Sequence, residues 1–123
     1  MLRCITILIV PLLFISCAAP VTKHHERYYQ TQMCHDFAGE MEYVLEDRTR
    51  VDCLTDEYAI EVDFAKKWAE SIGQSLFYAQ MTGKKPAIGL IVDRKKEQRY
   101  VKRLNLIAKK YNITVFILPK YEQ

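Results

Sequence analysis

The alternation of hydrophobic and polar residues is clearest between residues 40 and 64, where hydrophobic side chains recur at every second position. A period of two is the pattern of β-strands. Two of the alternating runs are separated only by Asp56 and Glu57, so these two runs are predicted to form a β-hairpin. The three predicted strands are GEMEYVL, RVDCLT and YAIEVDF, and EDRT is the predicted turn after the first.

A helical pattern follows over residues 65–83. Apolar side chains recur there at the spacing of one helix face, and Gly83 is suited to end the helix as its C-cap. The apolar stripe consists of Trp68, Ile72, Leu76 and Ala79.

The remaining pattern predicts a strand, a helix and a strand. PAIGLIVD and ITVFILP are continuous apolar runs typical of buried strands. The helix between them is predicted over residues 95–111, with an inward face of Val101, Leu104, Ala108 and Tyr111. This order implies a right-handed parallel crossover. The predicted fold class is therefore α/β, with a mixed sheet built from a β-hairpin, a helix and a parallel βαβ unit.

The first twenty residues have the layout of a secretory signal peptide, with Arg3 ahead of an apolar run and small residues around Cys17. Three outcomes stay open. Cys17 is lipidated, as in the bacterial lipoprotein signals that this segment resembles; the chain is cleaved near Ala18 or Ala19; or the segment remains as an anchor.

All three outcomes place the folded part outside the cytoplasm, as a periplasmic protein or a membrane-anchored lipoprotein. The membrane is then expected as a partner only through the lipid or the signal anchor. Residues 21–36 are predicted to be a tether and a short helix, and residues 37–123 the α/β domain.

Export also changes the interpretation of the cysteines. Cys34 and Cys53 form an even pair in an oxidising compartment, which favours a disulfide. Such a bond would attach the N-terminal segment to the hairpin and stabilise the fold by roughly 3 kcal/mol. Two buried free thiols are the alternative. A zinc site is not expected, because the three histidines show no ligand spacing relative to either cysteine.

Charge is distributed unevenly along a chain whose net charge is +3. Residues 36–70 contain 11 acidic and 4 basic side chains, whereas residues 94–123 contain 9 basic and 2 acidic ones. A metal-dependent enzyme acting on a polyanion needs both kinds of surface. The basic segment is also consistent with a helix that has a solvated face.

The hairpin predicts which side chains share a face. If Asp56 and Glu57 are the loop, Thr55 pairs with Tyr58, and the two strands can be counted back from there. The core face would carry Val51, Cys53, Ile60 and Val62, and the other face Arg50, Asp52, Glu61 and Asp63.

This register places Asp52 opposite Glu61 and Arg50 opposite Asp63. Like charges on opposite strands lie about 5 Å apart and are destabilising, so Asp52 and Glu61 favour a cation between them. Carboxylates with carbonyls and water are the ligands that Mg²⁺ prefers. A slipped register, or both carboxylates facing solvent, is the alternative.

Asp52 and Glu61 on a hairpin, followed by Gln74 and Tyr78 on a helix, resemble the PD-(D/E)xK nuclease superfamily, which has the restriction-endonuclease-like fold. In that family an aspartate closes one strand, a Glu-x-Lys lies on the next, and some branches add Gln-x-x-x-Tyr on the following helix. The resemblance covers about residues 42–92. This segment is also similar to small exported bacterial proteins of unknown function in that superfamily.

The resemblance implies a nuclease-like phosphodiesterase acting on nucleic acid, foremost DNA, outside the cytoplasm. Asp52 and Glu61 would bind Mg²⁺ or Mn²⁺, which activates water and stabilises charge on the phosphate. Gln74 would orient a ligand or contact the nucleic-acid backbone, and Tyr78 would support it, although such a pair is also common on helix surfaces. Glu42 resembles an additional upstream acid of some members. Because compact nucleases of this kind often act as dimers, a homodimer is a further implied partner.

Asp63 departs from the family pattern, because it occupies the position of the family lysine. One explanation is that Lys66 or Lys67 reaches back from the start of the helix, or that Asp63 is a third metal ligand or a partner of Arg50. The other is that cleavage is lost and only binding remains, in an inactive nuclease-fold module or envelope lipoprotein. The sequence leaves both open, and with them whether the protein is an enzyme.

Overall fold

The computed structural model describes residues 25–121, so the predicted signal peptide and Cys17 lie outside the described residues. The fold is α/β and is built on a five-stranded mixed sheet with the strand order β1-β2-β3-β4-β5. Strands β1, β2 and β3 are antiparallel neighbours, whereas β3, β4 and β5 are parallel. The strands are β1 (Glu40–Val44), β2 (Arg50–Leu54), β3 (Tyr58–Phe64), β4 (Lys85–Val92) and β5 (Thr114–Pro119).

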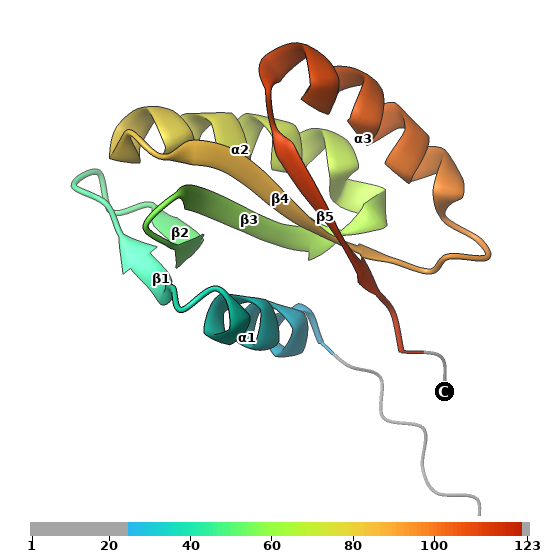
Figure 1. Cartoon of the computed structure of the whole chain (residues 1–123), viewed down its shortest axis with the longest axis horizontal. Helices are drawn as coiled ribbons and strands as arrows, with labels where there is room; N and C mark the ends of the chain where they lie inside the picture. Colours follow the sequence, from blue (N-terminus) through green and yellow to red (C-terminus); the bar gives the residue numbers. More distant parts are fainter. Residues whose placement is uncertain (1–24, 122–123) are drawn as a thin grey trace, which may run out of the picture.

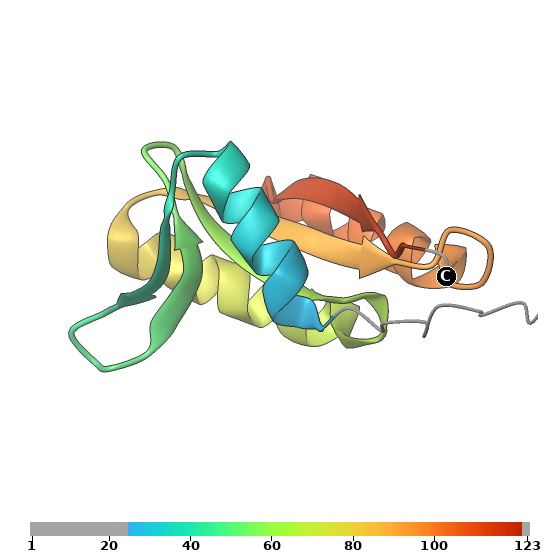
Figure 2. The same cartoon turned by 90° about the horizontal axis from the view of Figure 1, so that it is seen from below.

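Helices cover both faces of the sheet (Figures 1 and 2). Helix α1 packs on one face, where its residues share a hydrophobic cluster with β3 and β4. Helices α2 and α3 pack on the other face, in a second cluster with β4. The helices are α1 (Glu26–Asp36), α2 (Trp68–Thr82) and α3 (Gln98–Tyr111), with the short 3₁₀ helix η1 (Ala65–Lys67) leading into α2. The described residues thus contain a complete core, and none of their helices has the length and hydrophobicity to cross a membrane.

The predicted hairpin register is confirmed next to the turn and ends soon after it. Cys53 pairs with Ile60 and Leu54 with Ala59, and the turn closes with a 2.9 Å hydrogen bond from Thr55 N to Tyr58 O. Strand β1 pairs with β2 along its other side from Arg50 to Leu54, whereas the pairs with β3 stop at Cys53. The strands β2 and β3 therefore diverge and leave a fork between them.

Two predictions from the extended register are wrong because of this fork. Arg50 pairs with Val44 of β1, and its side chain lies 3.6 Å from the Glu42 carboxylate, so it is not the partner of Asp63. Val51 does not share the core face of Cys53, Ile60 and Val62; it packs in a separate cluster with Leu45, Ala59 and Tyr78.

Helix α2 buries two kinds of side chain, an apolar stripe and two serines. The predicted stripe of Trp68, Ile72 and Leu76 packs into the cluster that includes α3. Ser71 and Ser75 are fully buried, and each hydroxyl donates a 3.0 Å hydrogen bond to a carbonyl of the preceding turn. Small side chains at these positions allow the helix to lie close to its neighbours. Gly83 ends the helix in the left-handed conformation (φ 69°), as predicted.

Helix α3 begins three residues later than predicted. The side chain of Asp93 accepts hydrogen bonds from the backbone N–H groups of Lys95 and Lys96 (3.0 and 3.2 Å), which holds this segment in a turn. Val101, Leu104 and Ala108 face the core as predicted. Tyr111 does not, because it is the last helical residue and is 49% exposed; Ile113 is buried in the cluster instead.

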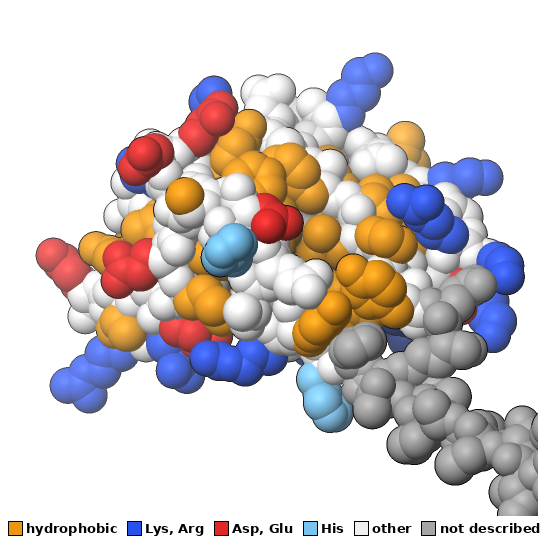
Figure 3. Space-filling model, turned by 60° about the horizontal axis from the view of Figure 1, so that its bottom comes forward, with side chains coloured by type: hydrophobic (Ala, Val, Ile, Leu, Met, Phe, Trp, Pro, Cys, Tyr) orange, Lys and Arg blue, Asp and Glu red, His pale blue; other side chains and the backbone are white. Residues whose placement is uncertain are grey.

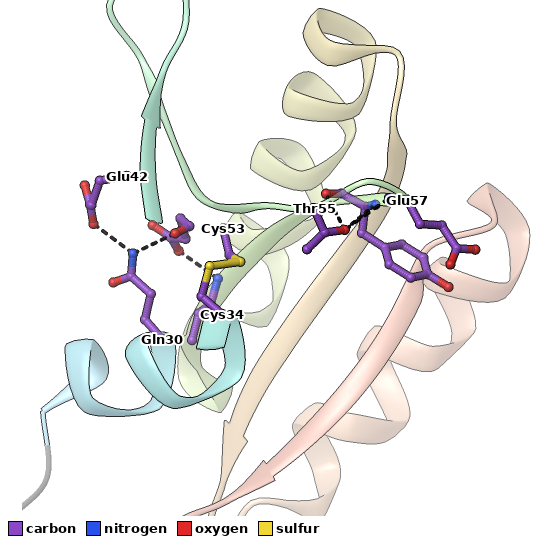
Figure 4. Close-up of a disulfide and its surroundings, with 9 residues drawn as sticks. Gln30, Cys34, Glu42, Cys53, Thr55 and Glu57 are labelled. Atoms are coloured by element: carbon purple, nitrogen blue, oxygen red, sulfur yellow. Dashed lines mark hydrogen bonds between the residues drawn. A yellow bond between two sulfur atoms is a disulfide. The ribbon is translucent and has the colours of Figure 1, made fainter. Parts of the chain in front are cut away.

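The predicted disulfide between Cys34 and Cys53 is present and joins α1 to β2, with the two Cα atoms 5.5 Å apart (Figure 4). Gly39 leaves room for it, because a Cβ atom at this position would meet the Sγ atoms of both cysteines. Disulfides are typical of proteins outside the reducing cytoplasm.

Candidate active site

Asp52 and Glu61 lie together in the fork between β2 and β3. One oxygen of Asp52, Oδ2, accepts a 2.7 Å hydrogen bond from the backbone N–H of Val62, so the Asp52 side chain bonds to β3 beyond the last backbone pair. The carboxyl group of Glu61 donates a hydrogen bond to Asp52. The structure therefore brings together the two acids that the sequence singled out, although they are not a regular cross-strand pair.

A second pair of acids, Asp63 and Glu26, adjoins the first. Glu26 is in the first turn of α1, and its carboxyl group donates a hydrogen bond to Asp63. Asp63 Oδ1 also accepts a 2.8 Å hydrogen bond from the backbone N–H of Phe64 and lies 3.5 Å from Lys67 Nζ. Sequence reasoning missed Glu26, because an acidic residue in the first turn of a helix has an ordinary explanation in the helix dipole.

Burial raises the pKa values of all four acidic groups. Burial, followed by the charge of Asp52, raises the pKa of Glu61 to about 9. Burial also raises the pKa of Asp52 to about 6 and, together with the charge of Asp63, that of Glu26 to about 7. Burial is also the main cause that raises the pKa of Asp63. Near neutral pH the metal-free site is therefore partly protonated, and full ionisation would need a compensating cation.

Glu61 contributes a buried oxygen that lacks a partner. Its Oε2 atom has no hydrogen-bond partner among residues 25–121, and the residue is only 5% exposed. A buried carboxyl oxygen without a partner is costly, because its desolvation is not offset by a hydrogen bond. The orphaned oxygen is thus available to a ligand.

Gln74 and Tyr78 bring α2 to the site. Gln74 lies one helical turn before Tyr78, and Tyr78 lies close enough to Glu61 that the carboxylate charge adds to burial in raising the pKa of the phenol. Gln74 Oε1 is buried and, within the described chain, has no hydrogen-bond partner. Tyr78, with Gln74 beside it, therefore borders the acids from α2.

Glu42 occupies a neighbouring position on the side of α1 (Figure 4). The buried side chain of Gln30 donates hydrogen bonds from Nε2 to Glu42 Oε1 (2.8 Å) and to the backbone oxygen of Asp52 (3.0 Å). The Glu42 carboxylate also lies 3.7 Å from Arg27 and 3.6 Å from Arg50. Gln30 thus links α1 to Asp52, a role that sequence reasoning missed because it depends on how α1 packs.

The two lysines at the start of the helix have different surroundings. Lys67 reaches Asp63, whereas Lys66 is exposed and lies near Tyr100 of α3. Lys67, and not Lys66, therefore supplies the positive charge beside Asp63.

A metal ion fits the Asp52–Glu61 pair by the chemistry of its donors. The part of the chain that the structure describes contains no group of three or more His, Cys, Asp or Glu side chains placed to hold a metal ion together, and Asp63 is engaged with Lys67 and Glu26. Two carboxylates, one of them with an orphaned oxygen, nevertheless suit Mg²⁺, which keeps several waters and uses few protein ligands.

Comparison of the chain with protein-family models, with curated proteins and with solved structures found no match. The geometry of the fork is therefore the basis for assigning a function.

Proposed function

We propose that this protein is a metal-dependent phosphodiesterase with a nuclease-like site, acting on nucleic acid outside the cytoplasm. The observation that carries the proposal is the convergence of Asp52 and Glu61, with a buried Glu61 oxygen that has no partner within residues 25–121. The mixed sheet, in which a hairpin and a helix precede a parallel βαβ unit, is compatible with the restriction-endonuclease-like fold.

Each side chain has a role in this proposal. Asp52 and Glu61 would hold Mg²⁺ or Mn²⁺, and the bound ion would supply Lewis-acid activation of water and neutralise charge on the phosphate. Lys67, 3.5 Å from Asp63, offers the positive charge that the sequence lacks two residues after Glu61. Gln74 and Tyr78 border the site from α2 and are positioned to orient a ligand.

The test is cleavage by a purified fragment of residues 21–123, which contains every described element. With Mg²⁺ or Mn²⁺ it should degrade single- or double-stranded DNA, and Glu61→Gln should reduce the rate by at least about 100-fold, because one metal-binding oxygen is lost. Glu57→Gln is the matched control, since Glu57 is an exposed glutamate in the hairpin turn. Absence of cleavage by the wild-type fragment with either ion would contradict the enzymatic proposal for these substrates.

A second candidate is a binding module without catalytic activity. Asp63 favours it, since its carboxyl group is where the family has a lysine and is paired with Glu26 and Lys67. Isothermal titration with Mn²⁺ and with DNA separates the two: binding that depends on Glu61, without cleavage, would support the module.

A further inference from the structure

Among the described residues, strand β5 (Thr114–Pro119) is an edge strand with one unpaired side, and its last residue, Pro119, is the one residue in it of a kind that protects such edges. Among the described strands it pairs only with β4, so every second residue has backbone groups directed away from the sheet. The strand has no charged residue: its sequence is TVFILP. Natural proteins usually protect such edges with charges, bulges or irregular backbone, because free edges pair with other strands.

The opposite edge, β1 (Glu40–Val44), is protected in that way. It carries Glu40 and Glu42, and Glu42 has a left-handed backbone (φ 55°), which interrupts the regular edge. The two edges of the sheet therefore differ, and only β5 is suited to pairing.

A groove of about 400 Å³ runs along the β5 edge on the side of α1. It is lined by five consecutive residues of β5, Val115–Pro119, by residues of α1, and by Phe37 and Tyr121, which follow α1 and β5. Successive side chains of a strand point to opposite faces, so a hollow that touches all five follows the backbone edge. Figure 3, which brings this side forward, shows hydrophobic side chains gathered at the surface.

Apolar side chains lie on both sides of the edge. On the α1 side, the rings of Phe116 and Phe37 are 5.0 Å apart, and Phe37 is 38% exposed. On the α3 side, Leu106 is 76% exposed and lines a mostly apolar hollow with Lys102, Asn105 and Lys109. Tyr100 packs in the cluster with Trp68 of α2, so helical spacing places this hollow on the flank of α3 that faces away from α2.

We propose that the β5 edge is the interface of a homodimer, in which β5 pairs antiparallel with β5 of a second copy about a twofold axis and joins the two sheets. A twofold axis makes any one surface meet itself, and an uncharged strand can meet its own copy without opposing like charges. A six-residue strand provides about 20 Å of pairing.

The observations favour a second copy over a bound peptide. A peptide would fill the groove beside α1 but leave the hollow around Leu106 uncovered. A second copy would bring its own α3 to that flank while its β5 fills the edge, so both apolar features would be buried together. Lys102 and Lys109 line this flank with their aliphatic stems and can turn their ammonium groups to solvent.

Sedimentation equilibrium and hydrogen exchange of the 21–123 fragment test the proposal. We expect a monomer–dimer equilibrium, and amide protection in residues 114–119 that increases with protein concentration. Strand β1 is the internal control and should show no such increase. Leu106→Lys should weaken the dimer by at least about fivefold in Kd, which corresponds to about 1 kcal/mol.

Val44→Lys is the matched control, because Val44 is an apolar residue of the other edge strand and is 59% exposed. It should leave the dimer unchanged. A fragment that remains monomeric up to about 1 mM, or one whose concentration-dependent protection appears in β1 and not in β5, would overturn the proposal. A peptide-binding edge would give the monomeric result. None of these measurements depends on nuclease activity, so this proposal can fail without affecting the proposed function.

Discussion

At the scale of single residues, the sequence predicts some members of the candidate site and misses others. The alternation of the hairpin identified Asp52 and Glu61 as neighbours, and the resemblance to a nuclease motif suggested Gln74 and Tyr78 as further site residues. Glu26 could not be predicted from the pattern, because it reaches Asp63 only through the packing of α1. The choice between Lys66 and Lys67 depends on the 3₁₀ geometry of η1, which sequence periodicity does not define.

The buried acids make the stability of the metal-free protein depend on pH. Their pKa values are raised in the folded state, to about 9 for Glu61 and about 7 for Glu26, so the folded protein binds more protons than the unfolded chain. The stabilisation is complete below the unfolded pKa of about 4.5 and is lost as the pH rises through these values. We therefore expect Tm, measured with a chelator, to fall between pH 5 and pH 9.

Two comparisons test the origin of this pH dependence. Glu61→Gln should flatten the decrease in Tm, because an amide does not ionise, whereas Glu57→Gln should not, since Glu57 is exposed and its pKa is lowered by Lys85. Mg²⁺ should also flatten it by favouring the ionised carboxylates. A Tm that stays level or rises over this range in the metal-free protein would contradict the protonation of the cluster.

At the scale of elements, α2 shows why a hydrophobic stripe identifies only part of a helix surface. The stripe correctly identified the side that meets α3. The most buried positions, Ser71 and Ser75, are polar and small, and their hydroxyl groups are satisfied within the helix itself. A search for hydrophobic residues passes over them.

Substitutions in α2 should separate these two kinds of position. Ser75→Leu should lower the free energy of unfolding by about 1–3 kcal/mol, because a fully buried small residue leaves no room for a larger one. Gly73→Ala should raise it by about 1 kcal/mol, because alanine favours the helix and the space around Gly73 is open. Urea denaturation measures both. Equal tolerance of the two substitutions would show that α2 does not pack closely on the sheet.

At the scale of the whole molecule, the sequence predicted the α/β class, the hairpin and the βαβ unit. It did not predict how far the hairpin ladder extends, because beyond Cys53 the Asp52 side chain takes the place of a backbone partner for the Val62 N–H group, which the alternation of residues does not reveal. The disulfide was predicted from cysteine count and export, and its effect on the fold became apparent with the packing of α1. The same helix brings Glu26 and Gln30 to the acids, so the cross-link also holds part of the site in place.

Replacing both cysteines, as Cys34→Ser with Cys53→Ser, should lower the free energy of unfolding by about 3 kcal/mol, the value expected for a loop of this size. A reducing agent should destabilise the wild-type fragment by a similar amount and leave the double variant unchanged. Chemical denaturation with and without reductant measures this difference. A wild-type fragment that is insensitive to reduction would show that packing alone holds α1 on the sheet.

The unequal edges of the sheet have a consequence for solubility at high concentration. A sheet with two free edges can add neighbours without limit and grow into fibres. Here the acidic, irregular β1 strand closes one end, so strand addition at β5 is self-limiting. Removing the protection of β1, rather than altering β5, is the change that would turn a finite assembly into an open-ended one.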